Sequence, residues 1–271
     1  MALLATLILG PWLLLQGRRV RRVTPVLPEP PGPRSGRVEP PSLLSAPSAP
    51  SALKHPGHES KSLRVLITGD SAAAGVGAPH QQLALSGQLP SRLAQSFSCP
   101  IEWSLVAQTG LTVESLCGLL AQQDPSEAYD VVLVSIGVNE VTAGTGVTAW
   151  QSRLGGLHGL LTGRLGARCV LYSGIPPMHR FPALPQPLRW FLGRRARRLD
   201  QALAQWVTRV PGAYWVPLPD LPDEAIAADG FHPGVQAYRA WAEAVVPIAM
   251  RAPLQLFQLL QPAIESVDKL E

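Results

Sequence analysis

The chain has 271 residues, 46% of them hydrophobic, which is enough to bury one substantial core and predicts one globular domain with extensions. Its formal net charge is +4, but the basic residues gather at 18–22 and 194–198 without interleaved aromatic residues, which argues against nucleic-acid binding. The three cysteines, Cys99, Cys117 and Cys169, are widely spaced and form no CxxC pair, which favours neither a disulfide framework nor a zinc site.

The first part of the chain is an apolar run at residues 2–15, which is interrupted by Gly10 and Pro11 and followed directly by arginines within 18–22. A helix of about 14 residues covers roughly 21 Å, less than the roughly 30 Å of a bilayer's hydrocarbon layer. A short span, an interfacial anchor and a signal-peptide core all remain open. Arginines that follow an apolar segment favour the cytoplasmic side, so we expect residues 1–22 to attach a cytoplasmic domain to the membrane. A periplasmic or secreted protein is the alternative.

Two further segments lie outside the expected domain. Residues 23–61 are rich in Pro, Ser and Ala with little apolar periodicity, which predicts an extended linker. Residues 252–271 begin as an amphipathic tail that we expect to dock on the domain, and their end is expected to derive from an expression vector. Residues 62–251 then form the folded domain.

Strand-like and helix-like segments alternate through this domain. The expected strands are short runs rich in β-branched or aromatic residues, at 65–68, 101–107, 131–136, 169–175 and 214–218. The expected helices occupy 87–96, 113–122, 148–164, 188–208 and 234–250. Alternation of this kind indicates βαβ units, and it predicts a three-layer α/β/α sandwich with a five-stranded parallel sheet.

Ser71 follows the first strand within Gly69-Asp70-Ser71, so it lies at the carboxyl edge of the sheet, where open α/β folds place their sites. A serine in this position is also a common helix N-cap. A hydrolytic serine needs a base and an orienting carboxylate at the same edge. Asp229 and His232 share one loop after the last strand, so the carboxylate can hold one imidazole nitrogen while the other faces Ser71. The alternative is that Asp229 caps the final helix and His232 packs as an aromatic residue.

Two other loops offer groups that could bind an oxyanion. Asn139, after the third strand, can aim its side-chain amide at a developing negative charge, although Asn is also common in turns. Gly110, after the second strand, has a bare backbone whose N–H can approach a ligand closely. The four candidate groups therefore fall on four loops at one edge of the predicted sheet.

With these residues the sequence resembles the SGNH hydrolases, also called GDSL-type esterases and lipases. The resemblance spans about residues 63–248 and rests on Gly69-Asp-Ser71, Gly110, Gly137-Val-Asn139 and Asp229-Gly-Phe-His232. One departure is Glu140, because Gly-x-Asn-Asp is commoner in the family, and it puts the hydrogen bonding of that loop in doubt.

The resemblance implies a flavodoxin-like strand order, 2-1-3-4-5. It also implies Ser71 as the nucleophile, His232 as general base and then acid, and Asp229 as its orienter. The oxyanion hole would consist of the backbone N–H groups of Ser71 and Gly110 and the side chain of Asn139.

Residues 174–191 form a Pro-rich, apolar segment after the fourth strand. We expect it to be a wall or lid for an acyl chain, or else a surface loop packed on its own domain. The expected lining consists of Met178, Phe181, Leu184, Trp190 and Phe191. His179 in this segment is a weaker candidate for the base than His232, because no carboxylate lies near it in sequence.

Taken together, these features predict a serine esterase that hydrolyses a small-molecule acyl ester through an acyl-enzyme, without cofactor or metal. A membrane surface is a second expected partner, and nucleic acid is not. A lysophospholipase, a thioesterase or an acyltransferase with the same site are alternatives within this chemistry. A non-catalytic ligand-binding module and a membrane-tethered scaffold are alternatives outside it. Gly75-Val-Gly77 resembles part of a phosphate loop but lacks Gly-Lys-Ser/Thr and Gly-x-Gly-x-x-Gly.

Overall fold

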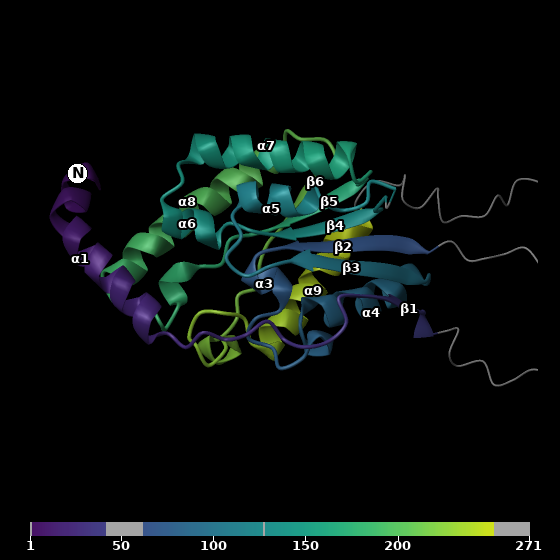
Figure 1. Cartoon of the computed structure of the whole chain (residues 1–271), viewed down its shortest axis with the longest axis horizontal. Helices are drawn as coiled ribbons and strands as arrows, with labels where there is room; N and C mark the ends of the chain where they lie inside the picture. Colours follow the sequence, from purple (N-terminus) through teal and green to yellow (C-terminus); the bar gives the residue numbers. More distant parts are fainter. Residues whose placement is uncertain (1, 42–61, 127, 252–271) are drawn as a thin grey trace, which may run out of the picture.

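Five parallel strands form the centre of the fold in the computed structural model, which describes residues 2–41, 62–126 and 128–251 (Figure 1). They are β2 (Leu63–Gly69), β3 (Ile101–Ala107), β4 (Val131–Ser135), β5 (Cys169–Ser173) and β6 (Ala213–Val216). Their spatial order is β3-β2-β4-β5-β6, which is the expected 2-1-3-4-5 order when only these strands are counted. Every residue of β4 and β5 is buried, which explains why these strands are continuous apolar runs.

Helices cover both faces of the sheet and create two apolar cores. One core contains Val65 and Ile67 of β2 and packs under α3 (Ser71–Ala74), α4 (Leu85–Phe97) and α9 (Val235–Arg251). The other contains Leu66 of β2 and packs under α5 (Val113–Leu120), α6 (Val138–Ala143), α7 (Val147–Gly163) and α8 (Leu188–Val207). Successive β2 side chains point to opposite faces, as strand geometry requires. Three short 3₁₀ turns complete the fold: η1 (Gln81–Leu83), η2 (Met178–Arg180) and η3 (Asp223–Ala225).

A sixth strand lies in the segment that the sequence analysis predicted as a linker. This strand, β1 (Ser35–Val38), pairs antiparallel with β3, with Ser35 opposite Ser104 and Val38 opposite Ile101. Its side chains are mostly exposed, because the strand joins an edge of the sheet through backbone hydrogen bonds. The prediction of a linker at residues 23–61 is therefore wrong for residues 35–38, and residues 42–61 lie outside the described residues. An exposed edge strand has no hydrophobic alternation from which it could be predicted.

The apolar N-terminal run is the first half of a helix, α1 (Ala2–Val23), which continues through the arginines and lies beside α8 (Figure 1). Leu13 is buried in the core, and the Gln16 side chain bonds the backbone of Gln186 and Leu188. Trp12, Leu14 and Leu15 are exposed. In the described parts of the chain, no helix combines the length and apolar character needed to cross a membrane. The tail at 252–271 lies outside the described residues.

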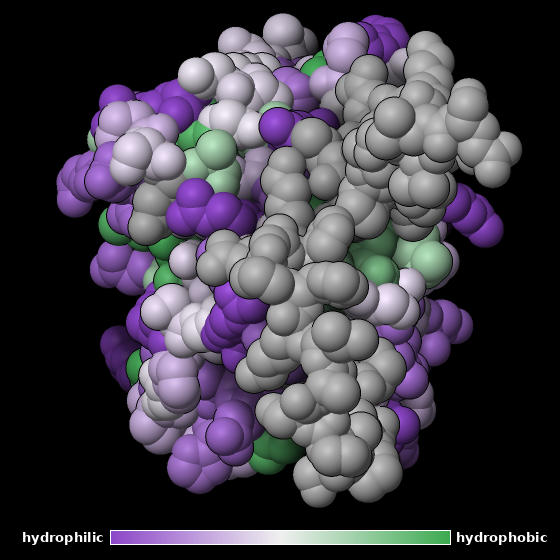
Figure 2. Space-filling model, turned by 90° about the vertical axis from the view of Figure 1, so that its right-hand side faces the viewer, coloured by the Kyte–Doolittle hydropathy of each residue, from purple (hydrophilic) through white to green (hydrophobic). Residues whose placement is uncertain are grey.

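The strands run toward α3 and α6, on the left of Figure 1, so the carboxyl edge of the sheet faces that side. The opposite side of the molecule is seen face-on in Figure 2. There, among the described residues, apolar side chains are scattered between hydrophilic ones. The loops that carry the candidate functional residues therefore lie at the other end of the molecule.

Candidate active site

Ser71 is the first residue of α3 and follows β2 through a tight turn. Gly69 has φ +145°, and a side chain there would overlap the backbone carbonyl of Ser135 on β4, so glycine lets the turn lie close to the next strand. Asp70 is the N-cap of α3, because its side chain accepts a hydrogen bond from the Ala72 N–H at 3.1 Å. Capping is thus performed by Asp70, and the Ser71 hydroxyl is available for another partner.

That partner is His232. The distance from His232 Nε2 to Ser71 Oγ is 2.9 Å, and the distance from His232 Nδ1 to Asp229 Oδ2 is 2.5 Å. Asp229 Oδ1 also accepts hydrogen bonds from the backbone N–H groups of Phe231 and His232, each at 3.0 Å. The imidazole is therefore held between a hydroxyl and an oriented carboxylate, as a nucleophile–base pair requires.

The charge of Asp229 is stabilised within its loop. Burial raises the pKa of this carboxyl, but the hydrogen bonds from the His232 side chain and from two backbone N–H groups outweigh it. The pKa of Asp229 is consequently below its ordinary value. A carboxylate at this position favours a proton on Nδ1, which leaves Nε2 free to accept the proton of Ser71.

Gly75 and Gly77, the glycines that resembled part of a phosphate loop, bring the two halves of this site together. Gly75 ends α3 with φ +93°, and Gly77 has φ +100°. A Cβ on Gly77 would overlap the Pro233 carbonyl and lie 3.3 Å from the Cβ of His232. The absence of a side chain at Gly77 therefore lets the loop after α3 approach the His232 loop.

The predicted oxyanion donors lie on the loops next to Ser71. In the sheet, Gly69 is in register with Ala107 of β3 and with Ser135 of β4, so the loops after β2, β3 and β4 start at one level. Gly110 has φ +85° in an exposed turn. Asn139 Nδ2 donates a hydrogen bond to the Leu111 carbonyl at 2.8 Å, which uses one of its two amide hydrogens and joins the two loops.

Glu140, the residue that departs from the family pattern, makes a second link between these loops. Its Oε1 accepts a hydrogen bond from the Val113 N–H, at the start of α5, at 2.7 Å, while its Oε2 is buried without a described partner. Burial raises the pKa of Glu140. Burial, together with the nearby Glu140, also raises the pKa of Asp70 to about 7. The longer side chain at 140 thus anchors α5, a role that the sequence did not reveal.

A cavity of about 430 Å³ opens beside Ser71 and His232. Its walls come from the loops after β4, β5 and β6 together with residues of α8 and α9, and they are mainly apolar. The lining includes Ile136, Ile175, Pro176, Pro177, Phe181, Trp215, Leu218, Leu221, Phe231 and Trp241. The Pro-rich loop at 217–222 supplies a further wall, which no sequence motif indicates.

The predicted acyl-chain lining needs correction, because only Phe181 of the five residues lines this cavity. Met178 and Leu184 are buried in the core instead. Trp190 is 46% exposed, and Phe191 packs beneath the guanidinium of Arg195. The reason is that α8 starts at Leu188, so Trp190 and Phe191 belong to a helix whose orientation is set by core packing.

His179 also lines the cavity, but no hydrogen bond joins it to a carboxylate among the contacts described, whereas His232 is bonded to Asp229. Across residues 2–41, 62–126 and 128–251, no group of three or more His, Cys, Asp or Glu side chains is placed to hold a metal ion.

Comparisons with known proteins agree with this architecture. Residues 67–240 match the GDSL-like lipase/acylhydrolase family. No curated protein matches the sequence.

Solved structures resemble the chain at low identity. A lipase from a goat rumen metagenome is 15% identical with a TM-score of 0.57, and the match covers 69% of this chain and 97% of that one. A GDSL-family lipolytic protein from Veillonella parvula is 14% identical with a TM-score of 0.55, covering 70% and 99%. A carbohydrate esterase family 2 enzyme from Corynascus thermopiles is 16% identical with a TM-score of 0.56, covering 76% and 68%. At these identities the likeness establishes the fold.

Proposed function

The chain belongs to the GDSL-like lipase/acylhydrolase family, and we propose that it is a serine esterase that hydrolyses acyl esters through an acyl-enzyme intermediate. The observation that carries this proposal is the hydrogen-bonded series from Ser71 Oγ through His232 to Asp229. In a family of carboxylic ester hydrolases, such a series supplies the nucleophile, the general base and the group that orients the base.

The proposed reaction has two steps. Ser71 Oγ attacks the ester carbonyl carbon while His232 Nε2 accepts the hydroxyl proton, and the resulting tetrahedral oxyanion collapses as His232 returns the proton to the departing alcohol. A water molecule then attacks the acyl-enzyme, again losing its proton to His232, and the acid is released as Ser71 regains its hydrogen. The N–H groups of Ser71 and Gly110 and the free amide hydrogen of Asn139 are the proposed oxyanion donors.

The cavity supports an apolar acyl group as the bound part of the substrate. Its volume of about 430 Å³ falls within the usual range of small-molecule sites, and Phe181, Phe231 and Trp241 contribute aromatic surface. A lysophospholipase, a thioesterase and an acyltransferase would use the same groups and differ in the leaving group or in the acceptor. Activity across a series of p-nitrophenyl esters of increasing chain length gives the preferred acyl length. Comparing a lysophospholipid with an acyl thioester identifies the leaving group, and product analysis in added alcohol separates transfer from hydrolysis.

The first experiment is Ser71→Ala, with the exposed Ser91→Ala on α4 as a matched control. We expect Ser71→Ala to abolish turnover of a p-nitrophenyl acyl ester and labelling by a fluorophosphonate probe, while circular dichroism shows an unchanged fold. Ser91→Ala should retain both. Undiminished hydrolysis by folded Ser71→Ala would refute Ser71 as the nucleophile, whereas a folded wild type that neither hydrolyses the ester nor reacts with the probe would favour a binding module.

We also propose that α1 associates the enzyme with an anionic membrane surface on the cytoplasmic side. Exposed Trp12, Leu14 and Leu15 precede the arginines of residues 18–22 on the same helix. Apolar side chains followed by cations suit an interfacial helix, which lies on a membrane instead of crossing it. In Figure 1, α1 lies toward the side of the molecule that carries α3 and α6.

A further inference from the structure

The loop that carries Gly110 is joined to β2 by one backbone hydrogen bond, from the Gln108 N–H to the Gly69 carbonyl at 3.3 Å, which does not involve Gly110 itself. Gln108, Thr109 and Gly110 are all exposed, and a Cβ built on Gly110 would meet no atom within 4 Å. Stabilising an oxyanion requires donors that are already in place before charge develops. Some other part of the chain must therefore fix the backbone at this point.

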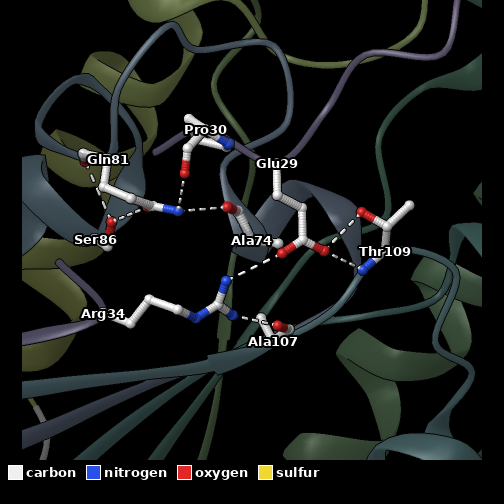
Figure 3. Close-up of polar contacts among 8 residues, drawn as sticks. All are labelled: Glu29, Pro30, Arg34, Ala74, Gln81, Ser86, Ala107 and Thr109. Atoms are coloured by element: carbon white, nitrogen blue, oxygen red, sulfur yellow. Dashed lines mark hydrogen bonds and ion pairs between the residues drawn. The ribbon is translucent and has the colours of Figure 1, made fainter. Parts of the chain in front are cut away.

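Glu29 makes the necessary contact from the N-terminal segment (Figure 3). Its Oε1 accepts a hydrogen bond from the Thr109 N–H at 2.7 Å and another from Thr109 Oγ1 at 2.9 Å. Thr109 directly precedes Gly110, and Asn139 holds the carbonyl of Leu111, which directly follows it. The backbone of Gly110 is thus fastened on both sides, once by Glu29 and once by Asn139.

Glu29 is itself held in place by an arginine. Arg34 Nη1 lies 3.0 Å from Glu29 Oε2, and its Nη2 donates a hydrogen bond to the Ala107 carbonyl at the end of β3. The Arg34 carbonyl accepts a hydrogen bond from the Leu105 N–H at 2.7 Å, and β1 follows directly. Although burial raises the pKa of Glu29, the hydrogen bonds from Thr109 and Arg34 outweigh it and lower the pKa. Glu29 therefore contacts Thr109 as a carboxylate.

The same segment is also linked, through Gln81, to the helix that begins at Ser71. The Pro31 carbonyl accepts a hydrogen bond from the Gln81 N–H at 2.9 Å, and the Pro30 carbonyl accepts one from Gln81 Nε2 at 3.3 Å. Gln81 is buried, and its Nε2 also donates to the carbonyl of Ala74, the last residue of α3, at 2.9 Å (Figure 3). One short segment is therefore linked to the nucleophile's helix, through Gln81, and directly to the Gly110 loop.

We propose that Glu29 is a positioning residue of the oxyanion hole, which fixes the Gly110 N–H through its two hydrogen bonds to Thr109. This inference rests on the proposed esterase function. The segment before β1 then contributes to the active site, although its composition alone indicates a linker.

The test compares Glu29→Ala with Glu39→Ala, a control directly after β1 that removes an ion pair with Arg37. We expect Glu29→Ala to lower kcat for a p-nitrophenyl ester by about tenfold to 100-fold, because misplacing a catalytic donor costs up to about that much. KM should change less than about twofold. Glu29→Gln, whose amide oxygen can still accept both Thr109 hydrogen bonds but whose amide nitrogen loses the bond to Arg34, should restore part of the lost kcat.

Titration with a fluorophosphonate counts the folded active sites in each preparation. Because kcat is then expressed per active site, a variant that only lowers the fraction of folded enzyme shows an unchanged kcat. If Glu29→Ala does not fold, Thr109→Val is the variant to test. It removes the hydrogen bond from Thr109 Oγ1 to Glu29 and keeps the one from the Thr109 N–H, so kcat should fall about threefold. Wild-type kcat in folded Glu29→Ala, or in Thr109→Val where that variant is used, would overturn the inference. Inactive wild type, or active Ser71→Ala, would instead refute the proposed function.

Discussion

Asp70, which directly precedes Ser71, and the nearby Glu140 are two buried carboxyl groups, and each has a raised pKa. Each has a structural hydrogen bond: Asp70 caps α3, and Glu140 holds the start of α5. Burying an ionised carboxylate is costly, which is why burial raises the pKa of both groups in the folded protein. The titration of Asp70 and Glu140 should therefore make the free energy of unfolding depend on pH, independently of any effect on catalysis.

Asp70→Asn should remove part of the pH dependence of stability. In the unfolded chain Asp70 ionises near its ordinary pKa of 3.8, whereas the folded protein keeps its proton until about pH 7. The folded state thus binds more protons between these values, so the free energy of unfolding falls as pH rises through that window and is constant above it. The variant keeps a capping oxygen but does not titrate.

The free energy of unfolding of Asp70→Asn, relative to that of the wild type, should rise by up to about 4 kcal/mol between pH 4 and pH 8. Urea unfolding at a series of pH values measures this quantity. The exposed Asp124→Asn is the control, and it should follow the wild type above pH 5. A pH-independent difference between Asp70→Asn and the wild type would contradict the predicted titration.

At the scale of secondary-structure elements, the agreement between sequence and structure depends on burial. The strand expected at 101–107 is β3 (Ile101–Ala107), and the helix expected at 188–208 is α8 (Leu188–Val207). Both elements bury apolar side chains at regular intervals, which is the signal that periodicity detects. The exposed strand β1 lacks this signal and was missed.

Glu140 connects two elements, because it lies on α6 and accepts a hydrogen bond from the first residue of α5. Glu140→Ala should destabilise the protein by about 1–3 kcal/mol, since the Val113 N–H would lose its buried partner. Glu140→Gln keeps an acceptor oxygen and should cost less. Urea unfolding of the wild type and both variants measures these differences. If Glu140→Ala were as stable as Glu140→Gln, this hydrogen bond would not couple α5 to α6.

At the scale of the whole molecule, α1 provides the proposed contact with a membrane. The full-length protein should sediment with vesicles of phosphatidylcholine and phosphatidylserine more strongly than with phosphatidylcholine alone. Arg18→Gln with Arg22→Gln should weaken this binding roughly 30-fold, because each arginine near an anionic surface contributes about 1 kcal/mol.

Arg239→Gln on α9, where the arginine pairs with Glu243, is the matched control and should bind as the wild type does. Added salt should also weaken binding of the wild type. Equal binding to the two kinds of vesicle would exclude an electrostatic contact with anionic lipid.

The sequence by itself determined the features that depend on neighbouring residues or on regular burial. These are the five parallel strands, the helices between them, and the pairing of Asp229 with His232, which are three residues apart in one loop. Ser71 could be predicted at the carboxyl edge because Gly69-Asp70-Ser71 ends an apolar strand.

Only the tertiary structure decided the features that join distant segments. Glu29 reaches Thr109 across 80 positions of the chain, and the cavity walls come from the separate loops after β4, β5 and β6. Met178 and Leu184 are as apolar as the cavity lining, but packing places them in the core. The physical reason is that hydrophobicity drives a side chain out of water without specifying whether a core or a cavity receives it, and backbone pairing at an edge leaves no pattern in the side chains.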